Sequence, residues 1–241
     1  MSEPILHVEG VEKVFGSLKA LGPVTVSLQP GERLGVIGPN GSGKTTLINC
    51  LTGTLTPTSG EVWFLGRKVT NLAPHQRARM GLARSFQIPK PFTGMTVLEN
   101  LLVPLDHLHD VADPHGRAME VLASVGLAGR AQHEAGGLTQ LELRKLELAR
   151  ALVGRPKVLI ADEAMAGLSD REIDDVLTIL ERLNESGVAV IMIEHIMHAV
   201  MRFSHRIICL ETGKLIADGL PETVANDPLV QKVYFGEQAR H

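Results

Sequence analysis

A glycine-rich segment that contains one lysine and two threonines carries the clearest chemistry in this chain: Gly38-Pro39-Asn40-Gly41-Ser42-Gly43-Lys44-Thr45-Thr46. The apolar run 34–37 precedes it and an amphipathic stretch follows it. Glycines at this spacing let successive backbone N–H groups point at phosphate oxygens, and Lys44 adds a positive charge. Thr45 places a hydroxyl where a nucleotide-bound Mg²⁺ needs an oxygen ligand. The segment predicts a nucleoside triphosphate site built from a strand, a loop and a helix in that order.

Two adjacent carboxylates, Asp162 and Glu163, end the apolar run 158–161. Such a run is typical of a strand buried on both faces of a parallel sheet, and ligands of open α/β sheets bind at the carboxyl ends of these strands. We expect Asp162 to hold Mg²⁺ and Glu163 to orient or polarise the water that attacks the γ-phosphate. The alternative is an ordinary solvated strand end.

Two further polar residues leave β-prone runs in the same way. His195 follows the apolar run 188–193, and Gln87 follows a shorter run. A strand-end imidazole could contact the γ-phosphate or the attacking water. Taken singly, each residue is more often an ordinary surface or core side chain.

The elements that position these residues alternate between two kinds of pattern. Short β-prone runs before the glycine-rich segment, with another at 61–65, predict an antiparallel sheet. From Thr96 to about Leu152 the pattern is helical and begins with a capping box of Thr96 and Glu99. A second capping box, Ser169 with Glu172, predicts a helix that ends near Asn184. The chain is therefore predicted to be α/β, with an antiparallel sheet and a helical insert.

Composition and charge argue against several classes of protein. The 241 residues carry a net charge of −3, which argues against a nucleic-acid partner bound through a broad basic face. No run approaches the ~20 apolar residues of a membrane-spanning helix, and the N-terminus lacks the pattern of a secretion signal, so we expect a soluble cytosolic protein. Cys50 and Cys209 lie in apolar runs and are expected to be reduced thiols. A cluster of acidic residues and histidines is interpreted as a solvated loop rather than a metal site: Asp106, His107, His109, Asp110, Asp113 and His115.

The order of these parts resembles the nucleotide-binding subunit of ABC transporters over essentially the whole chain. The resemblance implies one ABC ATPase domain over 1–241, a P-loop NTPase core with a helical subdomain at about 96–152, and ATP and Mg²⁺ as ligands. It implies that Glu163 is the catalytic carboxylate and His195 the switch residue. Gln87 would contact Mg²⁺ and the attacking water and link the site to a membrane subunit. Phe15 would stack on adenine, although taken alone it could equally be a core aromatic.

ABC ATPases act as head-to-tail dimers in which a signature segment of one subunit completes the phosphate loop of the other. The resemblance places that segment at Leu138, Thr139, Gln140, Leu141 and Glu142. Leu141 stands where the family has glycine and Glu142 where glutamine is usual, so a side chain and a negative charge could obstruct the partner's nucleotide unless they turn away. We therefore expect a heterodimer with a second ABC ATPase whose signature is intact. A backbone adjustment that tolerates Leu141 is the alternative.

Several segments resemble ATPases of branched-chain amino-acid uptake systems: 95–102, 163–168, 213–219 and 234–237. The resemblance implies a peripheral position on the cytoplasmic face of the inner membrane and two integral membrane subunits that dock beside Gln87, Pro89, Pro91 and Phe92. An extracytoplasmic solute-binding protein would take part indirectly. Importers of urea, amides or aromatic acids are alternatives, as is an ATP-binding regulatory subunit with weak turnover. A DNA-repair or translation ATPase is disfavoured by the acidic charge balance.

Overall fold

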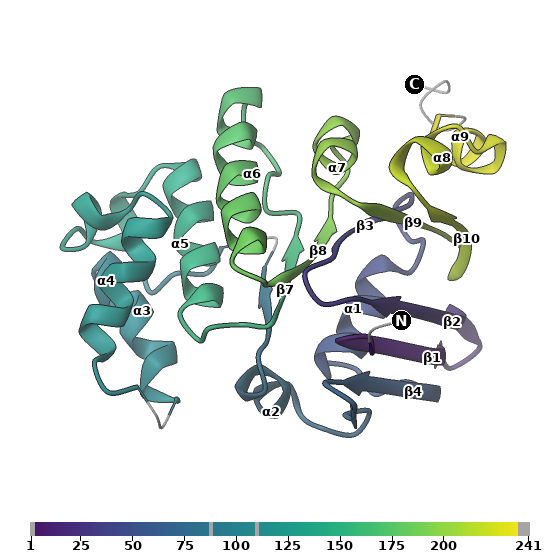
Figure 1. Cartoon of the computed structure of the whole chain (residues 1–241), viewed down its shortest axis with the longest axis horizontal. Helices are drawn as coiled ribbons and strands as arrows, with labels where there is room; N and C mark the ends of the chain where they lie inside the picture. The colour runs from purple at the N-terminus through teal and green to yellow at the C-terminus, as the bar shows by residue number, and fades with distance from the viewer. Residues whose placement is uncertain (1–2, 87–88, 109–110, 236–241) are drawn as a thin grey trace.

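The computed structural model describes residues 3–86, 89–108 and 111–235, and a six-stranded sheet forms its centre (Figure 1). The strand order is β10-β9-β3-β8-β7-β6, and every neighbouring pair is parallel except β10 with β9. The inner strands β7 and β8 are buried along their whole length, as their apolar runs predicted. The strands are β3 (Arg33–Ile37), β6 (Leu82–Ser85), β7 (Val158–Asp162), β8 (Ala189–Ile193), β9 (Arg206–Glu211) and β10 (Lys214–Gly219).

A second, antiparallel sheet has the order β2-β1-β4-β5. The first strand, β1, is long, and its pairing with β2 shifts in register between Val8 and Val14. In β4 the indole N–H of Trp63 donates to Glu61 Oε2 at 3.1 Å. The four strands are β1 (Leu6–Phe15), β2 (Leu18–Leu28), β4 (Ser59–Phe64) and β5 (Arg67–Lys68).

Helices flank the central sheet (Figure 1). Along the chain, the segment between β6 and β7 is mainly helical. Both predicted capping boxes are confirmed: Thr96 N–H donates to Glu99 Oε2 at 2.7 Å, and Ser169 N–H donates to Glu172 Oε2 at 2.9 Å. The helices are α1 (Lys44–Thr52), α2 (Pro74–Arg79), α3 (Val97–Asp106), α4 (Pro114–Ser124), η1 (Ala128–Arg130), η2 (Ala135–Gly137), α5 (Gln140–Leu152), α6 (Asp170–Glu185), α7 (Met197–Phe203), α8 (Pro221–Ala225) and α9 (Pro228–Phe235).

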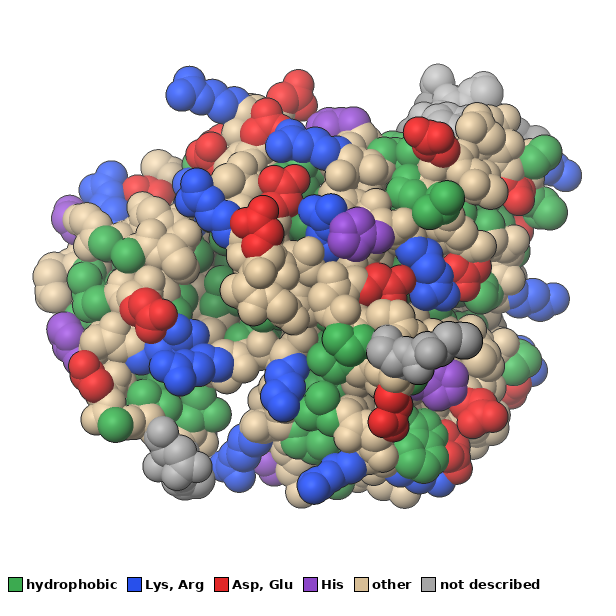
Figure 2. Space-filling model, viewed as in Figure 1, with side chains coloured by type: hydrophobic (Ala, Val, Ile, Leu, Met, Phe, Trp, Pro, Cys, Tyr) green, Lys and Arg blue, Asp and Glu red, His purple; other side chains and the backbone are tan. Residues whose placement is uncertain are grey.

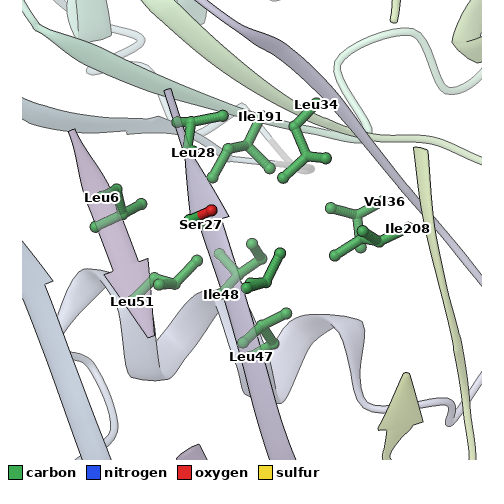
Figure 3. A pocket seen from close by; sticks show the side chains of 11 residues that line it. Leu6, Ser27, Leu28, Leu34, Val36, Leu47, Ile48, Leu51, Ile191 and Ile208 are labelled. Carbon is green, nitrogen blue, oxygen red and sulfur yellow. The ribbon is translucent and has the colours of Figure 1, made fainter. Parts of the chain in front are cut away.

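The helix that follows the glycine-rich segment, α1, is held between the two sheets. Its side chains Leu47, Ile48 and Leu51 point into an apolar pocket (Figure 3). The rest of the lining comes from both sheets: Leu6, Val26, Ser27, Leu28, Leu34, Val36, Ile191 and Ile208. Burial of apolar surface on both sides fixes α1, and with it the loop at its N-terminus.

The acidic and histidine cluster is less loop-like than predicted. Asp106 ends α3, Pro104 lies inside that helix, and Asp113 caps α4 by accepting the Gly116 N–H at 2.8 Å. Pro114 is the first residue of α4, where proline is tolerated, and α3 continues past Pro104, so the predicted break in helical structure is shorter. His109 and Asp110 lie outside the described residues. Cys50 and Cys209 are free and fully buried, and no described helix is long and apolar enough to cross a membrane.

Candidate nucleotide site

The phosphate loop, residues 38–46, connects β3 to α1 in a conformation that requires glycine. Gly38 has a φ of 148°, and a Cβ there would lie 2.2 Å from the Leu210 carbonyl oxygen. Gly43, the residue before α1, has a φ of 102°, and its Cβ would lie 2.9 Å from the Ala20 carbonyl oxygen. Backbone from β9 and β2 therefore packs directly against the loop and leaves no room for a side chain.

Donors inside the loop fit a phosphate group. Lys44 is 7 % exposed, and its ammonium donates to the carbonyl oxygens of Gly38 at 2.6 Å and Pro39 at 3.0 Å. Burial lowers the pKa of Lys44, while the nearby Glu163 and Asp162 carboxylates oppose that shift. The Ser42 hydroxyl is buried and has no hydrogen-bond partner among the described residues. A phosphate oxygen would supply the acceptor that this hydroxyl lacks.

One pocket joins the phosphate loop to the strand-end residues. Ala20, residues 40–46, Glu163 and His195 line it together. His195 Nε2 lies 3.1 Å from Glu163 Oε1, so the imidazole and the carboxylate are hydrogen-bonded. The fold thus brings together three segments that the sequence identified separately, because β3, β7 and β8 are neighbours whose carboxyl ends meet.

Asp162 lies at the end of β7 and is nearly buried, at 7 % exposure. Its Oδ2 accepts from Arg84 Nη2 at 2.5 Å, and the same guanidinium donates to Asn49 Oδ1 at 2.8 Å. This ion pair was not predicted from the sequence, because Arg84 belongs to β6, which pairs with β7 across the helical insert. The carboxylate predicted to hold Mg²⁺ is therefore already oriented by a cation.

Two further predicted site residues are Phe15 and Gln87. Phe15 ends β1, is 46 % exposed, and has the Lys13 ammonium 5.1 Å from its ring centroid. The ring is partly exposed, and its stacking on adenine stays a prediction. Gln87 lies outside the described residues.

The predicted signature segment, Leu138 to Glu142, runs from the C-cap of η2 to the first residues of α5. Thr139 is the N-cap: Glu142 N–H donates to its hydroxyl at 3.3 Å, and Thr139 N–H donates to Glu142 Oε2 at 2.9 Å. Arg130 also binds Glu142 Oε1 at 2.9 Å. The glutamate charge is thus paired within the helical region, and Leu141 packs partly buried against its core.

Two groups near the site were not identified as functional by sequence reasoning. Glu194, directly before His195, is 2 % exposed, and burial raises the pKa of Tyr234 of α9, an effect that the nearby Gly38 backbone of the phosphate loop opposes. The position of Glu194 at the end of an apolar strand was the available signal for that residue. No local pattern marks Tyr234, which reaches the phosphate loop only through the packing of α9.

Two family models match the chain. One is described as "ABC transporter" and matches residues 21–166, and the other, "Branched-chain amino acid ATP-binding cassette transporter", matches residues 214–240. The high-affinity branched-chain amino acid transport ATP-binding protein BraF of Pseudomonas aeruginosa is 38% identical, over 98% of this chain and 100% of BraF. Its counterpart LivG of Escherichia coli is 37% identical, again over 98% of this chain and 100% of LivG.

Solved structures agree with these sequence matches. The ADP conformation of an ATP-binding cassette of an ABC transporter has a TM-score of 0.89 at 33% identity, covering 98% of this chain and 100% of that one. A dimeric cassette in a post-hydrolysis state, bound to ADP and Pi, has a TM-score of 0.81 at 27% identity, covering 90% of this chain and 98% of that one. The antiparallel sheet, the parallel sheet and the helices between them therefore have the same arrangement in proteins of known structure.

Proposed function

Since this chain belongs to the ABC transporter ATP-binding proteins of the branched-chain amino-acid transport family, we propose that it drives the import of branched-chain or other hydrophobic amino acids by hydrolysing ATP at the pocket described above. The observation that carries this proposal is the placement of the Glu163 carboxylate in the same pocket as the phosphate loop, hydrogen-bonded to His195.

In this proposal, some residues of the pocket bind the phosphates and others orient water and transfer its proton. Backbone N–H groups of the phosphate loop and the Lys44 ammonium bind the β- and γ-phosphates. Glu163 orients the attacking water and accepts its proton. His195 Nε2, at 3.1 Å, donates to the Glu163 carboxylate and fixes its direction.

We also propose that Mg²⁺ accompanies the nucleotide. Thr45 at the start of α1 and Asp162 at the end of β7 supply hard oxygen ligands of the kind that Mg²⁺ prefers, and Gln87 is a further predicted ligand. The ion would neutralise negative charge on the β- and γ-phosphates. Arg84 holds the Asp162 carboxylate in place through an ion pair.

Replacement of Glu163 by glutamine tests the proposed chemistry. We expect E163Q to retain ATP binding and to lose ATP hydrolysis by about 100-fold or more, because general-base catalysis contributes on this order. The rate is measured as phosphate release by the complex purified through a tag on this chain. E185Q is the control, since Glu185 is an exposed residue at the end of α6. Full hydrolysis by E163Q would contradict the assigned role.

Membrane subunits are proposed to dock in a groove between the helical region and α2. Figure 2 shows the molecule hollowed between these two parts. The groove has apolar walls that include Leu82, Phe86 and Leu108, with Arg79, Arg84 and Arg150 among its lining residues. An amphipathic helix with an acidic residue has the matching chemistry. The chain would then act at the cytoplasmic face of the inner membrane.

The second ATPase subunit is proposed to be a different chain. Leu141 still occupies the signature position at which the family has glycine, so this chain is poorly suited to complete the site of a second copy. We expect L141G to raise the ATPase rate of the purified chain alone, because the exchange removes the side chain that a partner's γ-phosphate would meet. An unchanged rate, with nucleotide binding intact, would count against the heterodimer.

The solute is chosen by other subunits, so its identity needs a separate experiment. Purification of the native complex from membranes, followed by identification of its subunits and of the solutes bound by the associated binding protein, separates branched-chain amino acids from urea, amides and aromatic acids. A chain recovered alone, without membrane subunits, would contradict the transporter assembly.

A further inference from the structure

A buried carboxyl group lies beside the proposed catalytic site and has no role in the mechanism above. Glu194 follows the last residue of β8, is 2 % exposed, and precedes His195. A carboxyl group is seldom buried to this extent without a specific partner, because removal from water is costly. One partner is a backbone amide: Met165 N–H donates to Glu194 Oε1 at 2.9 Å.

Met165 belongs to the turn that carries Glu163. This turn, residues 163–168, leaves the end of β7 with Glu163 in a left-handed conformation, φ 48°, which costs free energy for a residue other than glycine. It is anchored first at Glu163, whose N–H donates to the Ile193 carbonyl oxygen at 2.9 Å. Its far side is anchored at the Ala166 carbonyl oxygen, which accepts from Arg144 Nη2 at 3.0 Å.

Glu194 supplies the middle anchor. Its bond to Met165 fixes the backbone of the turn between the two other anchors. Met165 lies two residues after Glu163, and Glu194 lies one residue before His195. The three anchors connect the turn to β8, to the segment after β8, and to α5. Without the Glu194 acceptor, the Met165 N–H would be buried without a partner, and the turn could relax its left-handed residue.

The charges around Glu194 agree with a role as a hydrogen-bond acceptor. Burial raises the pKa of Glu194 to about 7; the Met165 backbone amide opposes this rise, the Glu163 carboxylate adds to it, and the His195 backbone and Arg144 also oppose it. Tyr234 of α9 also lies within electrostatic range. A neutral or an ionised carboxyl group can each accept the Met165 N–H, so the bond is available in both forms.

From this geometry we propose that Glu194 is a positioning residue for ATP hydrolysis: through the Met165 amide it holds the Glu163 turn in the conformation that directs the Glu163 carboxylate at His195 and the attacking water. The inference rests on the proposed role of Glu163. It concerns the orientation of the catalytic carboxylate and not the affinity for nucleotide, because Glu194 does not line the pocket.

The test compares two replacements in the purified complex. E194Q keeps an oxygen acceptor for Met165 and should retain kcat within about twofold. E194L has a similar volume but no acceptor, and should lower kcat at least 10-fold with KM for Mg-ATP and the affinity for a fluorescent ATP analogue changed less than twofold. Unchanged kcat in E194L would overturn the proposal. So would an equal loss in E194Q, or a loss of nucleotide affinity that matches the loss of kcat.

A measurement on the unaltered protein keeps the test decisive if E194L does not fold. The Met165 amide should exchange its hydrogen as slowly as the amides of β8, and rapid exchange would overturn the proposed anchor. The E163Q experiment distinguishes a failure of the Glu194 proposal from a failure of the proposed ATPase mechanism. If E163Q is inactive while E194L is fully active, only the role of Glu194 fails, whereas a fully active E163Q removes the proposed mechanism itself.

Discussion

Single residues at this site are held in costly states by neighbours from other segments. Glu163 has a left-handed backbone conformation, and Glu194 and Lys44 are titratable groups with little exposure to water. Each has a specific backbone partner: Ile193 for Glu163, Met165 for Glu194 and Gly38 for Lys44. Strained and buried polar residues tend to gather at functional sites, where the surrounding structure compensates for their cost. The concentration of all three around one pocket agrees with its proposed function.

The buried carboxyl group of Glu194 predicts a pH-dependent stability. In the unfolded chain this group titrates near 4.3, whereas burial raises its pKa to about 7 in the folded chain. Between these values the folded state holds a proton that the unfolded state has lost, so the free energy of unfolding falls as the pH rises from about 4.3 to 7. This contribution is complete below pH 4 and lost above pH 7, and it amounts to at most about 4 kcal/mol.

Urea unfolding of the wild type and E194Q at several pH values measures this effect. Glutamine does not titrate, so the free energy of unfolding of E194Q relative to wild type should increase between pH 5 and pH 8. E185Q again serves as the control, because an exposed carboxyl group should give a difference that is flat over this range. A flat difference for E194Q would show that Glu194 ionises normally in the folded protein.

At the scale of elements, α1 depends on a buried arginine as well as on its apolar contacts. Arg77 of α2 is 1 % exposed and donates to the carbonyl oxygens of Cys50 at 2.7 Å and Leu51 at 2.6 Å. It also donates to the carbonyl oxygens of Thr70 at 2.8 Å and Leu72 at 3.1 Å. One guanidinium thus satisfies carbonyls near the end of α1 and in the segment that connects β5 to α2.

Arg77→Met should therefore destabilise the protein by about 2–4 kcal/mol, because buried carbonyl groups lose charge-assisted hydrogen bonds. Arg79→Met is the matched control, since Arg79 lies on the same short helix with an exposed side chain and should change stability by about 0.5 kcal/mol or less. Chemical denaturation measures both. Equal effects of the two substitutions would mean that the Arg77 contacts contribute nothing specific.

Part of the nucleotide site could be predicted from the sequence, and part could not. The phosphate loop was predictable because its spacing is a local requirement of the backbone, and the strand-end residues 162, 163 and 195 because long apolar runs identify buried strands. Contacts between distant segments were not predictable: Arg84 meets Asp162 across 78 residues of sequence, and Met165 meets Glu194 across 29. No local pattern encodes which polar side chain will be buried against which backbone group.

At the scale of the whole molecule, two hydrophobic cores meet at the central sheet. One core contains α1 and the antiparallel sheet, and the other contains the helical region with α6 and α7. The docking groove lies where the helical region and the α2 side of the molecule face each other. A subunit seated in this groove, as proposed above, would contact both parts of the molecule.

The exposed ring of Phe92 is expected to contribute to the binding of the membrane subunits. Its ring is 43 % exposed, and its backbone is fixed by Asn100, which accepts the Phe92 N–H at 2.9 Å and donates to the Phe92 carbonyl oxygen at 3.1 Å. An exposed aromatic on a fixed backbone is typical of an interface anchor. Phe92→Ser should reduce the yield of membrane subunits that co-purify with this chain several-fold, without a loss of ATP binding.

Leu220→Ser provides the comparison for this assembly experiment. Leu220 is 67 % exposed at the start of α8, remote in the fold from the groove-lining residues. Quantitative immunoblotting of the purified complexes should find a normal yield for L220S. If F92S also gives a normal yield, Phe92 does not anchor the membrane subunits.

The chain has a single tryptophan, and its position makes it an optical reporter of one part of the molecule. Trp63 lies in β4 of the antiparallel sheet, where its indole N–H donates a hydrogen bond to Glu61. Most helices pack in the other core, which contains the helical region with α6 and α7. Its fluorescence will follow the environment of that sheet, and far-ultraviolet circular dichroism will follow the helices. Transitions that coincide in the two signals would mean that both cores unfold as one cooperative unit.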